Sequence, residues 1–494
     1  MDIAHPVLLA AFLLLAGVLA SKLSYRLGVP ALLLFLALGM LAGSEGVIGI
    51  EFADPEPAML IGVLALCLIL FDGGLHTDVR SMSSGVKRDG VLLATLGVML
   101  TAGLVAVFAV YVLGLDLVTG LLLGAIVSST DAAAVFAVLR AKNIGIKERV
   151  RSVLEFESGS NDPTAVFLTV TFITLATSGA HAGWLVPVVF VYKLAGGLLA
   201  GYVLGRVLVA LLNWIDLEYD GLYPVVTLAS VGVVFGLAEV IGTSGFMAVY
   251  VAGLTMADRV FVHRNSLLRF HEGLAWLMQI AMFVVLGLLA FPMRLIEAAP
   301  DGIFVALLLI FVARPFSVMI TLAFSDMTLR ERTMVSWVGL RGAAPIILAT
   351  FPLVAGVTGA EYLFDVVFFA VIVSVLLQGP SVAVMARKLR VDAPLDAPDA
   401  YPIEISAPAD IGVKIKRLVI GPDSEAAGAR LVDIGGPTRP LVVMLRRGGR
   451  IFVPTGRTLL EEDDELFVLG DPESIREFRA LLSSALPDAP TATS

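Results

Sequence analysis

The chain has 494 residues, of which 58% are hydrophobic and only 16% charged, with a formal net charge of −9. Soluble domains usually carry about 25% charged residues, so the excess of apolar side chains indicates a protein that faces lipid. The acidic balance and the lack of a basic cluster in the sequence exclude a nucleic-acid partner. The single cysteine, Cys67, excludes an internal disulfide and a cysteine-rich metal site, and we expect it to be buried by packing.

Apolar windows of about 20 residues predict membrane-spanning helices. Thirteen such windows predict an all-α polytopic membrane protein, with a small α+β cytoplasmic domain at its C-terminal end. The windows cover residues 6–22, 30–49, 58–75, 90–113, 117–138, 152–177, 184–211, 222–240, 243–257, 272–290, 302–324, 332–354 and 361–385.

The charges in the loops predict the orientation of the chain. Basic residues do not precede the first window, but Lys22 and Arg26 follow it, so we expect a retained first span with its N-terminus outside. Nearly all Lys and Arg residues of the loops then fall on the cytoplasmic side, and Arg294 alone falls on the opposite side. An odd number of spans places the C-terminus in the cytoplasm, and we expect the inner membrane to hold the protein.

The character of the sequence changes after the membrane domain, which we place at residues 1–390. Residues 391–402 are a Pro- and Asp-rich linker, residues 403–484 a small soluble domain, and residues 485–494 a disordered tail. Alternating apolar residues and turn signals predict four strands and a closing helix in the soluble domain. They lie at residues 415–420, 441–445, 451–453, 466–469 and 473–482.

Ionisable side chains inside the predicted spans are the strongest functional signal in this sequence. A charged group at the centre of a bilayer costs at least ~2.5–3.5 kcal/mol, so each of these residues is a functional candidate. We expect Lys193, in the seventh span, to lie at an interface or to reach towards the membrane surface. The candidates are Asp131, Glu157, Asp162, Lys193, Arg314 and Arg341.

The segment of residues 155–167, EFESGSNDPTAVF, holds two of these charges. On a helix, Glu157 and Asp162 are about 140° apart, so they face different surroundings and do not form one carboxylate pair. Pro163 has no backbone N–H, which leaves the carbonyl group of Gly159 without its helical partner. A free carbonyl group beside Asp162 favours cation coordination.

Two other spans are interrupted. Four consecutive polar residues, 128–131 (SSTD), lie in the fifth span, and residues 339–345 (GLRGAAP) bring Gly and Pro into the twelfth. Polar side chains inside a membrane need protein partners or water, so these stretches predict locally unwound helices. If the chain has two inverted six-helix halves and one linking helix, the two spans correspond, which points to a transporter site at mid-membrane.

The segments SSTDAAAV, ESGSNDPTA and GLRGA resemble those of the monovalent cation:proton antiporter-1 family, the NhaP-type Na⁺(K⁺)/H⁺ antiporters. The resemblance covers essentially the whole membrane part in matching order. It implies an NhaA-like inverted-repeat fold of thirteen helices, with a dimerisation domain and a mobile core domain in which two broken helices cross. It therefore also implies a homodimer.

The resemblance assigns roles to the polar residues around the breaks. Asp162 would bind the cation and the proton, and Asn161 would be its structural partner. Thr130 and Ser158 would supply oxygen ligands to the monovalent cation. Asp131 would compensate helix ends at the crossover, or help directly in ion binding.

The same resemblance implies an ion pair in the core. Arg341 would pair with Glu157, and Arg314 would be a further structural or site-shaping charge. We expect this pair to be structural rather than to carry ions.

Physical reasoning supports the central role of Asp162. Desolvation favours the protonated form of a lone carboxylic acid, which brings proton uptake towards physiological pH. A cation and a proton then compete for one carboxylate, so exchange should be one-for-one and electroneutral. Family members with an Asp-Asp pair behave differently, and Asn161 removes that second carboxylate. We expect no cofactor.

Residues 404–484 resemble the TrkA-C (RCK C-terminal) module of potassium channels and transporters. The cues include residues 443–449 (VMLRRGG) and 463–470 (DDELFVLG). The sequence has no GxGxxG before this region, so the dinucleotide-binding half of a full RCK unit is absent. Such modules usually pair and bind a small regulatory ligand. Antiporters that bear the module are similar to the potassium/proton subgroup, which favours K⁺ over Na⁺ as the exchanged cation.

Three alternatives need weighing. The first is a Na⁺/H⁺ antiporter of the same fold. The second is a ligand-gated potassium channel, which would have a carbonyl-lined filter such as TVGYG, and the sequence contains none. The third is a membrane enzyme, which needs a nucleophile with a base or a metal cluster near one membrane face. Because the polar residues gather at mid-membrane instead, we expect no enzymatic activity.

Overall fold

The computed structural model describes the chain as two units, residues 1–395 and 396–494. The described residues are 4–27, 30–77, 79–80, 82–178, 185–394, 414–421, 424, 426–434, 440–448 and 450–483.

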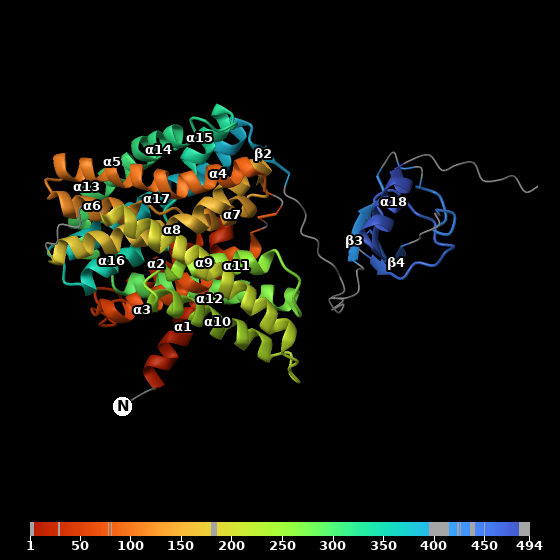
Figure 1. Ribbon diagram of the computed structural model, residues 1–494, viewed down its shortest axis with the longest axis horizontal. Helices are drawn as coiled ribbons and strands as arrows, with labels where there is room; N and C mark the ends of the chain where they lie inside the picture. Colours follow the sequence, from red (N-terminus) through yellow and green to blue (C-terminus); the bar gives the residue numbers. More distant parts are fainter. Residues whose placement is uncertain are drawn as a thin grey trace, which may run out of the picture. The chain divides into compact units, whose positions relative to one another are not determined.

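Thirteen helical segments of the described residues form the membrane unit, in the order that the sequence predicts (Figure 1). Nine of them are single helices. These are α1 (Ala4–Leu27), α2 (Ala31–Ala42), α3 (Pro55–His76), α8 (Glu148–Ser178), α9 (Leu185–Trp214), α10 (Leu222–Val240), α11 (Gly245–Ala257), α12 (Arg264–Leu288) and α17 (Ala360–Leu389).

The other four segments are composite. Two contain a π-helical turn: α4 (Ser84–Leu92), η1 (Leu93–Gly97) and α5 (Val98–Tyr111) form one, and α13 (Pro292–Leu308), η2 (Leu309–Ala313) and α14 (Arg314–Thr321) form the other. Two are broken: α6 (Leu117–Val127) with α7 (Ala132–Ala141), and α15 (Leu329–Trp337) with α16 (Ala343–Val354).

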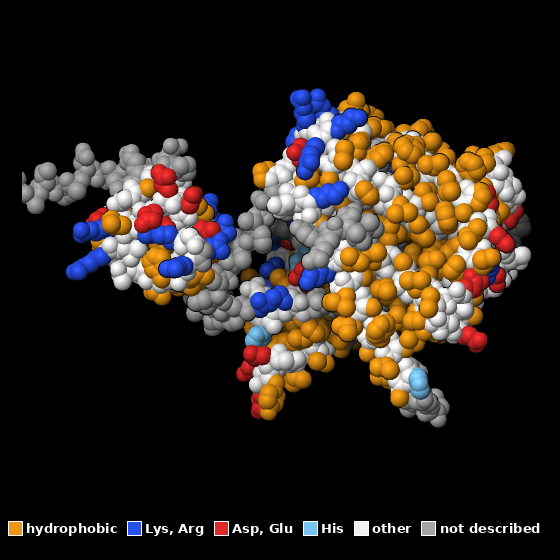
Figure 2. All heavy atoms as spheres, turned by 180° about the vertical axis from the view of Figure 1, so that it is seen from behind, with side chains coloured by type: hydrophobic (Ala, Val, Ile, Leu, Met, Phe, Trp, Pro, Cys, Tyr) orange, Lys and Arg blue, Asp and Glu red, His pale blue; other side chains and the backbone are white. Residues whose placement is uncertain are grey.

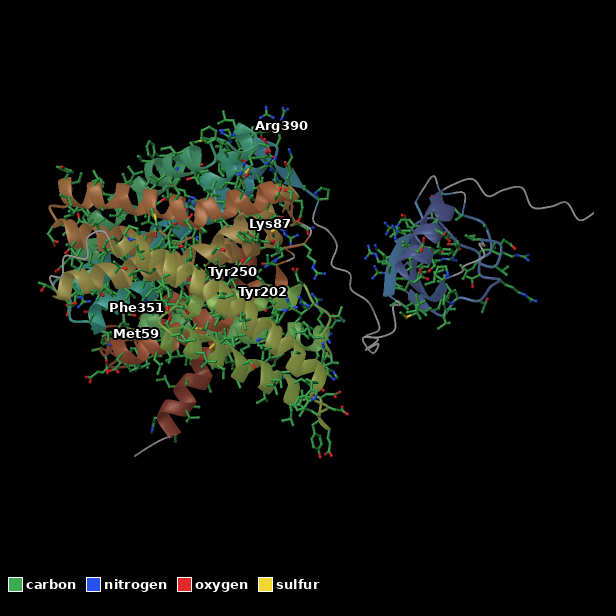
Figure 3. The ribbon with its side chains drawn as sticks, viewed as in Figure 1. Met59, Lys87, Tyr202, Tyr250, Phe351 and Arg390 are labelled. Atoms are coloured by element: carbon green, nitrogen blue, oxygen red, sulfur yellow. The ribbon has the colours of Figure 1, made fainter. Side chains whose placement is uncertain are left out.

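The surface of this unit is that of a membrane protein. Nine of the described helices are long and apolar enough to cross a bilayer, and α2, α11 and α16 are shorter apolar helices. Hydrophobic side chains cover the face seen in Figure 2, with most of the Lys and Arg, and some Asp and Glu, along one edge and mainly Asp and Glu along the other. Figure 3 shows Met59 and Phe351 towards one end of the helices, Lys87 and Arg390 towards the other, and Tyr250 between them.

The helices α1–α3 and α9–α12 pack into one bundle, which we call the scaffold bundle. Glycines bring its helices into backbone contact. A Cβ atom at Gly74 of α3 would lie 2.5 Å from the carbonyl oxygen of Tyr250 on α11, and one at Gly201 of α9 would lie 2.4 Å from that of Ala248. Small residues of this kind let membrane helices approach closely.

The remaining helices, α4–α8 and α13–α17, form the core bundle. It is built in the same way: a Cβ atom at Gly124 of α6 would lie 2.2 Å from the carbonyl oxygen of Ala102 on α5. Similarly, a Cβ atom at Gly302 of α13 would lie 2.8 Å from the Cβ atom of Phe369 on α17. The core bundle contains both broken helices and α8, and therefore every polar residue that the sequence singles out around the breaks.

The predicted linker starts later than expected. Strands β1 (Gly145–Ile146) and β2 (Asp392–Ala393) pair antiparallel, and the backbone N–H of Lys147 donates to the carbonyl oxygen of Val391 at 2.9 Å. The first residues of the segment 391–402 therefore belong to the membrane unit. The rest of that linker, the start of the soluble domain as far as residue 413 and the predicted tail, residues 485–494, lie outside the described residues.

The second unit is a small α+β domain with an antiparallel sheet of order β3-β6-β4-β5. The strands and the helix occur where the sequence predicts them: β3 (Lys414–Val419), β4 (Leu441–Arg447), β5 (Arg450–Phe452), β6 (Glu465–Gly470) and α18 (Pro472–Ser483). Its core contains Leu445, Leu466 and Phe478. The guanidinium of Arg447 donates to buried Asp464 at 2.8 Å, and this carboxylate raises the pKa of Arg447.

Candidate functional site

The two broken helices meet at their breaks. Residues 128–131 separate α6 from α7, and residues 338–342 separate α15 from α16. The backbone N–H of Asp131 donates to the carbonyl oxygen of Leu340 at 2.8 Å, so the two unwound segments are in direct contact. The interruptions predicted from the polar run SSTD and from the Gly/Pro-rich run are therefore confirmed, and they face each other inside the core bundle.

Asp131 lies at the N-terminal ends of two half-helices. Its Oδ1 accepts a hydrogen bond of 3.0 Å from the backbone N–H of Ala134, which caps α7. A Cβ atom at Gly342, the residue before α16, would lie 2.1 Å from Asp131 Oδ2. The N-terminal end of a helix carries a partial positive charge, so one carboxylate between two such ends compensates both.

Arg341 occupies the complementary position at two C-terminal ends. Its side chain is buried, Nε donates to the carbonyl oxygen of Val127 at 3.1 Å, and Nη1 donates to that of Gly339. Val127 is the last residue of α6, and Gly339 lies two residues beyond the end of α15, so the guanidinium is placed near two C-terminal helix ends, where the helix dipole is negative. The guanidinium is occupied by helix ends and does not pair with Glu157, so the expected Arg341–Glu157 pair is wrong.

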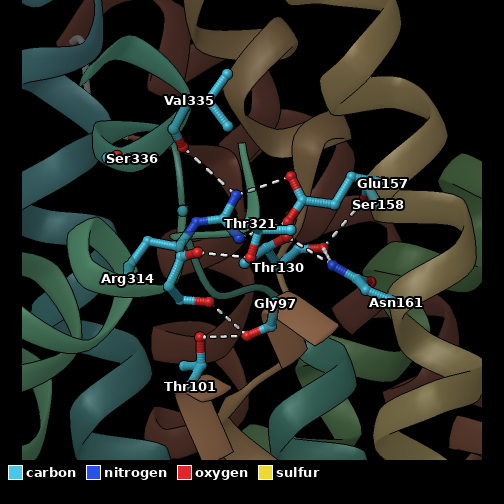
Figure 4. Close-up of polar contacts among 12 residues, drawn as sticks. Gly97, Thr101, Thr130, Glu157, Ser158, Asn161, Arg314, Thr321, Val335 and Ser336 are labelled. Atoms are coloured by element: carbon cyan, nitrogen blue, oxygen red, sulfur yellow. Dashed lines mark hydrogen bonds and ion pairs between the residues drawn. The ribbon is translucent and has the colours of Figure 1, made fainter. Parts of the chain in front are cut away.

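The partner of Glu157 is Arg314. The guanidinium donates from Nη2 to Oε2 at 2.8 Å and makes a second contact from Nη1 to Oε1 (Figure 4). Its Nη2 also approaches the carbonyl oxygen of Val335 at 3.4 Å. Arg314 follows directly on the π-helical turn η2, and such a turn changes the direction in which the next side chain points. The sequence places both arginines at membrane depth but does not reveal this change of register.

Asp162 faces a different neighbour, as its angular separation from Glu157 predicts. The hydroxyl of Ser129, in the break of the first broken helix, donates to Asp162 Oδ1. Asp162 is 8% exposed and has no Lys, Arg or His partner among the described residues. Ser129 stands in the polar run SSTD, but sequence reasoning selected Thr130 and Ser158 as ligands and missed it.

Asn161 and Ser158 tie α8 to the same break. The amide of Asn161 donates to Thr130 Oγ1 at 2.6 Å, and the hydroxyl of Ser158 donates to the Thr130 carbonyl oxygen at 3.1 Å (Figure 4). Ser158 Oγ in turn accepts from the backbone N–H of Ala132 at 3.1 Å. Asn161 Oδ1 is buried and has no hydrogen-bond partner among the described residues. In this structure Ser158 therefore holds the break in place through two hydrogen bonds, while Asn161 Oδ1 remains available to a bound cation.

A buried network on α17 supports the second break. The hydroxyl of Ser374 lies 3.3 Å from the backbone N–H of Arg341 and donates to Gln378 Oε1 at 2.6 Å. The Gln378 amide donates to the carbonyl oxygen of Trp337, the last residue of α15, at 2.7 Å. Sequence reasoning missed both residues, although polar side chains four apart in the last span were a signal for a shared helix face.

The arrangement can hold one monovalent cation or one proton. Hydroxyl, amide and carboxylate oxygens are hard ligands of the kind that such cations bind. Arg314 balances Glu157, and Asp131 and Arg341 balance opposite helix ends, so Asp162 is the carboxylate left without a fixed counter-charge. The described part of the chain has no group of three His, Cys, Asp or Glu side chains arranged for a metal ion of the usual kind.

Comparison with known proteins agrees with this architecture. The sequence profile of the family described as "Sodium/hydrogen exchanger, transmembrane" matches residues 9–388, and that of the TrkA-C domain matches residues 415–483. The sodium proton antiporter MjNhaP1 from Methanocaldococcus jannaschii has a similar structure, with a TM-score of 0.69 and 24% sequence identity. The match covers 79% of this chain and 99% of that chain, and it confirms the predicted antiporter fold.

Two curated proteins are similar over almost the whole chain. The K⁺/H⁺ antiporter NhaP of Alkalimonas amylolytica is 37% identical over 481 residues, which are 97% of this chain and 83% of that protein. The K⁺/H⁺ antiporter NhaP2 of Shewanella sp. (strain MR-4) is 39% identical over 486 residues, with the same two shares. Both matches include the membrane unit and the C-terminal domain.

Proposed function

Because this chain belongs to the sodium/hydrogen exchanger family, we propose that it exchanges K⁺ for H⁺ across a bacterial inner membrane, with Asp162 binding the two ions in turn. The observation that carries the proposal is the position of this carboxylate. It lies beside the break of a broken helix, is buried, accepts a hydrogen bond from Ser129 and has no basic partner in the described structure. A single negative site of this kind cannot hold a cation and a proton together.

Exchange on one carboxylate has a fixed stoichiometry. In each direction Asp162 crosses with one bound positive charge, either K⁺ or H⁺, and the balanced charges around it do not change. We therefore propose electroneutral, one-for-one antiport by alternating access, without a cofactor. The Glu157–Arg314 pair moves with the core bundle and remains paired throughout.

The choice of K⁺ rests on the relatives. The two curated proteins of 37–39% identity are named as K⁺/H⁺ antiporters, and they also match the C-terminal domain. The second candidate is Na⁺/H⁺ exchange, the activity named for the antiporter of similar fold from Methanocaldococcus jannaschii. The oxygen ligands at the break suit either ion.

We also propose an orientation and a regulatory role. The loop charges support an N-terminus outside and a C-terminal domain in the cytoplasm, where that domain binds a small ligand that alters exchange. The family resemblance supports a homodimer. Cross-linking of the protein in native membranes tests the dimer, and protease access to the C-terminal domain in sealed everted vesicles tests the orientation.

The test of the proposed function compares Asp162→Asn with wild type in everted vesicles. Addition of K⁺ to respiring vesicles should collapse the pH gradient with wild type and leave it unchanged with the variant. Asp220→Asn, a change at an exposed loop carboxylate, is the matched control and should behave as wild type. Cation-dependent proton flux through Asp162→Asn would overturn the proposal.

A further inference from the structure

One contact between the scaffold bundle and α8, the site helix that carries Asp162, is made by a large side chain seated on a glycine. The ring of Tyr250, on α11, lies against Gly159, on α8: a Cβ atom at Gly159 would be 2.2 Å from Cε2, 2.3 Å from Cζ and 2.6 Å from the hydroxyl oxygen. Gly159 precedes Asp162 by three residues, or roughly 4.5 Å along the helix axis. This contact between the bundles is therefore one turn from the ion-binding carboxylate.

The glycine contacts between the bundles are made with side chains. Within the bundles, a glycine faces either the backbone of the neighbouring helix or, as Gly90 does with Phe156, a side chain. Between the bundles, Gly159 faces an aromatic ring, and Gly62 of α3 faces the side chain of Ile347 on α16, whose Cγ2 would be 2.9 Å from a Cβ atom. A side chain that packs on a glycine does not interlock with the opposite helix, so the two helices can separate and pack again at this point.

The hydroxyl of Tyr250 gives a second, independent observation. The side chain is 1% exposed, and its hydroxyl makes no hydrogen bond of good geometry among the described residues, although the hydroxyls of Thr77 and Ser160 lie near it. A buried polar group left without a partner destabilises a fold, and a phenylalanine would fill this position without that cost. A buried hydroxyl without a good partner needs an explanation, and a contact between two bundles that change their relative position supplies one.

We propose that Tyr250 is a positioning residue for exchange: its ring, seated on Gly159, sets the position of α8 against the scaffold bundle and leaves Gly159 when the core bundle moves. The inference rests on the proposed antiport function and adds to it the contact across which the site helix moves. It requires glycine at position 159, because any side chain there would push α8 away from α11.

The test is a steric change and its compensation. Gly159→Ala should reduce the maximal rate of K⁺/H⁺ exchange at least tenfold in reconstituted vesicles, with the K⁺ concentration for half-maximal rate changed less than twofold, because the oxygen ligands remain. Gly159→Ala with Tyr250→Leu removes the atoms that clash and should recover most of the rate. Tyr250→Phe keeps the ring and should remain within about threefold of wild type, a change worth less than 1 kcal/mol.

Controls separate this inference from the proposed function and from misfolding. Gly103→Ala, on α5, adds the same methyl group where no atom lies within 4 Å and should exchange as wild type. A full rate for Gly159→Ala, or a double variant no faster than Gly159→Ala alone while both elute as folded protein, would refute the role of Tyr250. Absence of both K⁺-dependent and Na⁺-dependent proton flux in wild type would instead refute the antiport function.

An independent observation concerns the end of the membrane unit. Strand β2, the last described strand of the membrane unit, pairs with β1, which lies between α7 and α8. Gly145 packs against it so closely that a Cβ atom would be 2.7 Å from the carbonyl oxygen of Pro394 and 2.9 Å from that of Ala393. The segment that holds β2 is therefore β1, which follows the half-helix α7 and directly precedes α8, the helix that carries Asp162.

We infer that the β1–β2 ladder is the mechanical connection by which the C-terminal domain alters exchange. A displacement of β2 would move the loop that joins α7 to α8. Ser129 lies in the break before α7 and Asp162 lies on α8, so the displacement would reach both residues of this hydrogen bond. The inference rests on the proposed regulatory role of the domain. It predicts that loosening the ladder and removing the domain have the same effect, because both end the same connection.

A double-variant cycle tests this connection. Gly145→Val should displace β2 and shift the pH at which exchange is half-maximal by the same amount and in the same direction as removal of residues 396–494. In the shortened chain, Gly145→Val should add no further shift. A shift on truncation that Gly145→Val in the full chain does not reproduce would refute the ladder as the connection. No shift on truncation would refute the regulatory role itself.

Discussion

Arg314 and Glu157 form a two-contact ion pair inside the core bundle, with side chains that are only 3% and 1% exposed. The pair joins α14 to α8, the helix that carries Asp162. Removal of one partner leaves the other charge buried, which typically costs ~3–5 kcal/mol. Arg314→Ala should therefore lower the unfolding temperature of the purified protein strongly, whereas Arg330→Ala, at an exposed position, should not.

The Glu157–Arg314 pair should add far less to the free energy of unfolding than the loss caused by removing one of its partners. Replacing both partners of a buried pair by apolar residues is often neutral. Glu157→Leu combined with Arg314→Leu should thus be more stable than either single variant. If the double variant were the least stable of the three, the pair would not be the main interaction of these two side chains.

Asp131→Asn tests the compensation of helix ends. Asn is also a good N-cap residue, so the hydrogen bond to the Ala134 N–H should survive while the charge is lost. Interaction of a charge with helix ends is worth at most about 2 kcal/mol, so the variant should still fold, with a modest loss of thermal stability. Its exchange rate should be lower than that of wild type. A loss as large as that of Arg314→Ala would indicate instead that Asp131 is a partner in a buried ion pair.

Membrane voltage provides a test of stoichiometry. One-for-one exchange moves no net charge. A membrane potential that is set across proteoliposomes by an ion other than K⁺ should therefore leave the exchange rate unchanged. Each net charge that crosses would contribute about 2.3 kcal/mol per 100 mV, which makes even partial charge movement easy to detect. A rate that rises or falls steeply with voltage would contradict exchange on a single carboxylate.

Asp464 should control the stability of the C-terminal domain. It is fully buried and accepts hydrogen bonds from Arg447 and from the backbone N–H of Glu461. Hydrogen bonds to charged groups contribute roughly 1.5–3 kcal/mol, and the 30% exposure of the Arg447 side chain places this pair towards the lower end. In the full-length protein, Asp464→Ala should increase hydrogen exchange in β4 and β6 and leave the membrane helices unchanged.

Much of the fold can be predicted from the sequence, because lipid restricts the backbone to long apolar helices. The thirteen windows and the four strands appear in the structure in the predicted order. The breaks at residues 128–131 and 338–342 were also predictable, since consecutive polar residues and Gly/Pro runs cannot continue a lipid-facing helix.

The partners within the site were less predictable. Whether Glu157 meets Arg314 or Arg341 depends on the π-helical turn before Arg314 and on the carbonyl groups that occupy Arg341, and neither follows from helical periodicity. The contact of Ser129 with Asp162 likewise depends on the unwound backbone of residues 128–131, where the 3.6-residue repeat gives no direction.

The most direct test of the account measures protons released when the purified protein binds K⁺. In weakly buffered detergent solution, K⁺ should release protons from wild type, up to one per chain where Asp162 is protonated beforehand, and none from Asp162→Asn. Because the two ions compete, the apparent affinity for K⁺ should fall by about tenfold for each pH unit by which the pH is lowered, over the range where Asp162 is protonated. Binding of K⁺ to wild type with no proton release at any pH would contradict the claim that one carboxylate holds the two ions in turn.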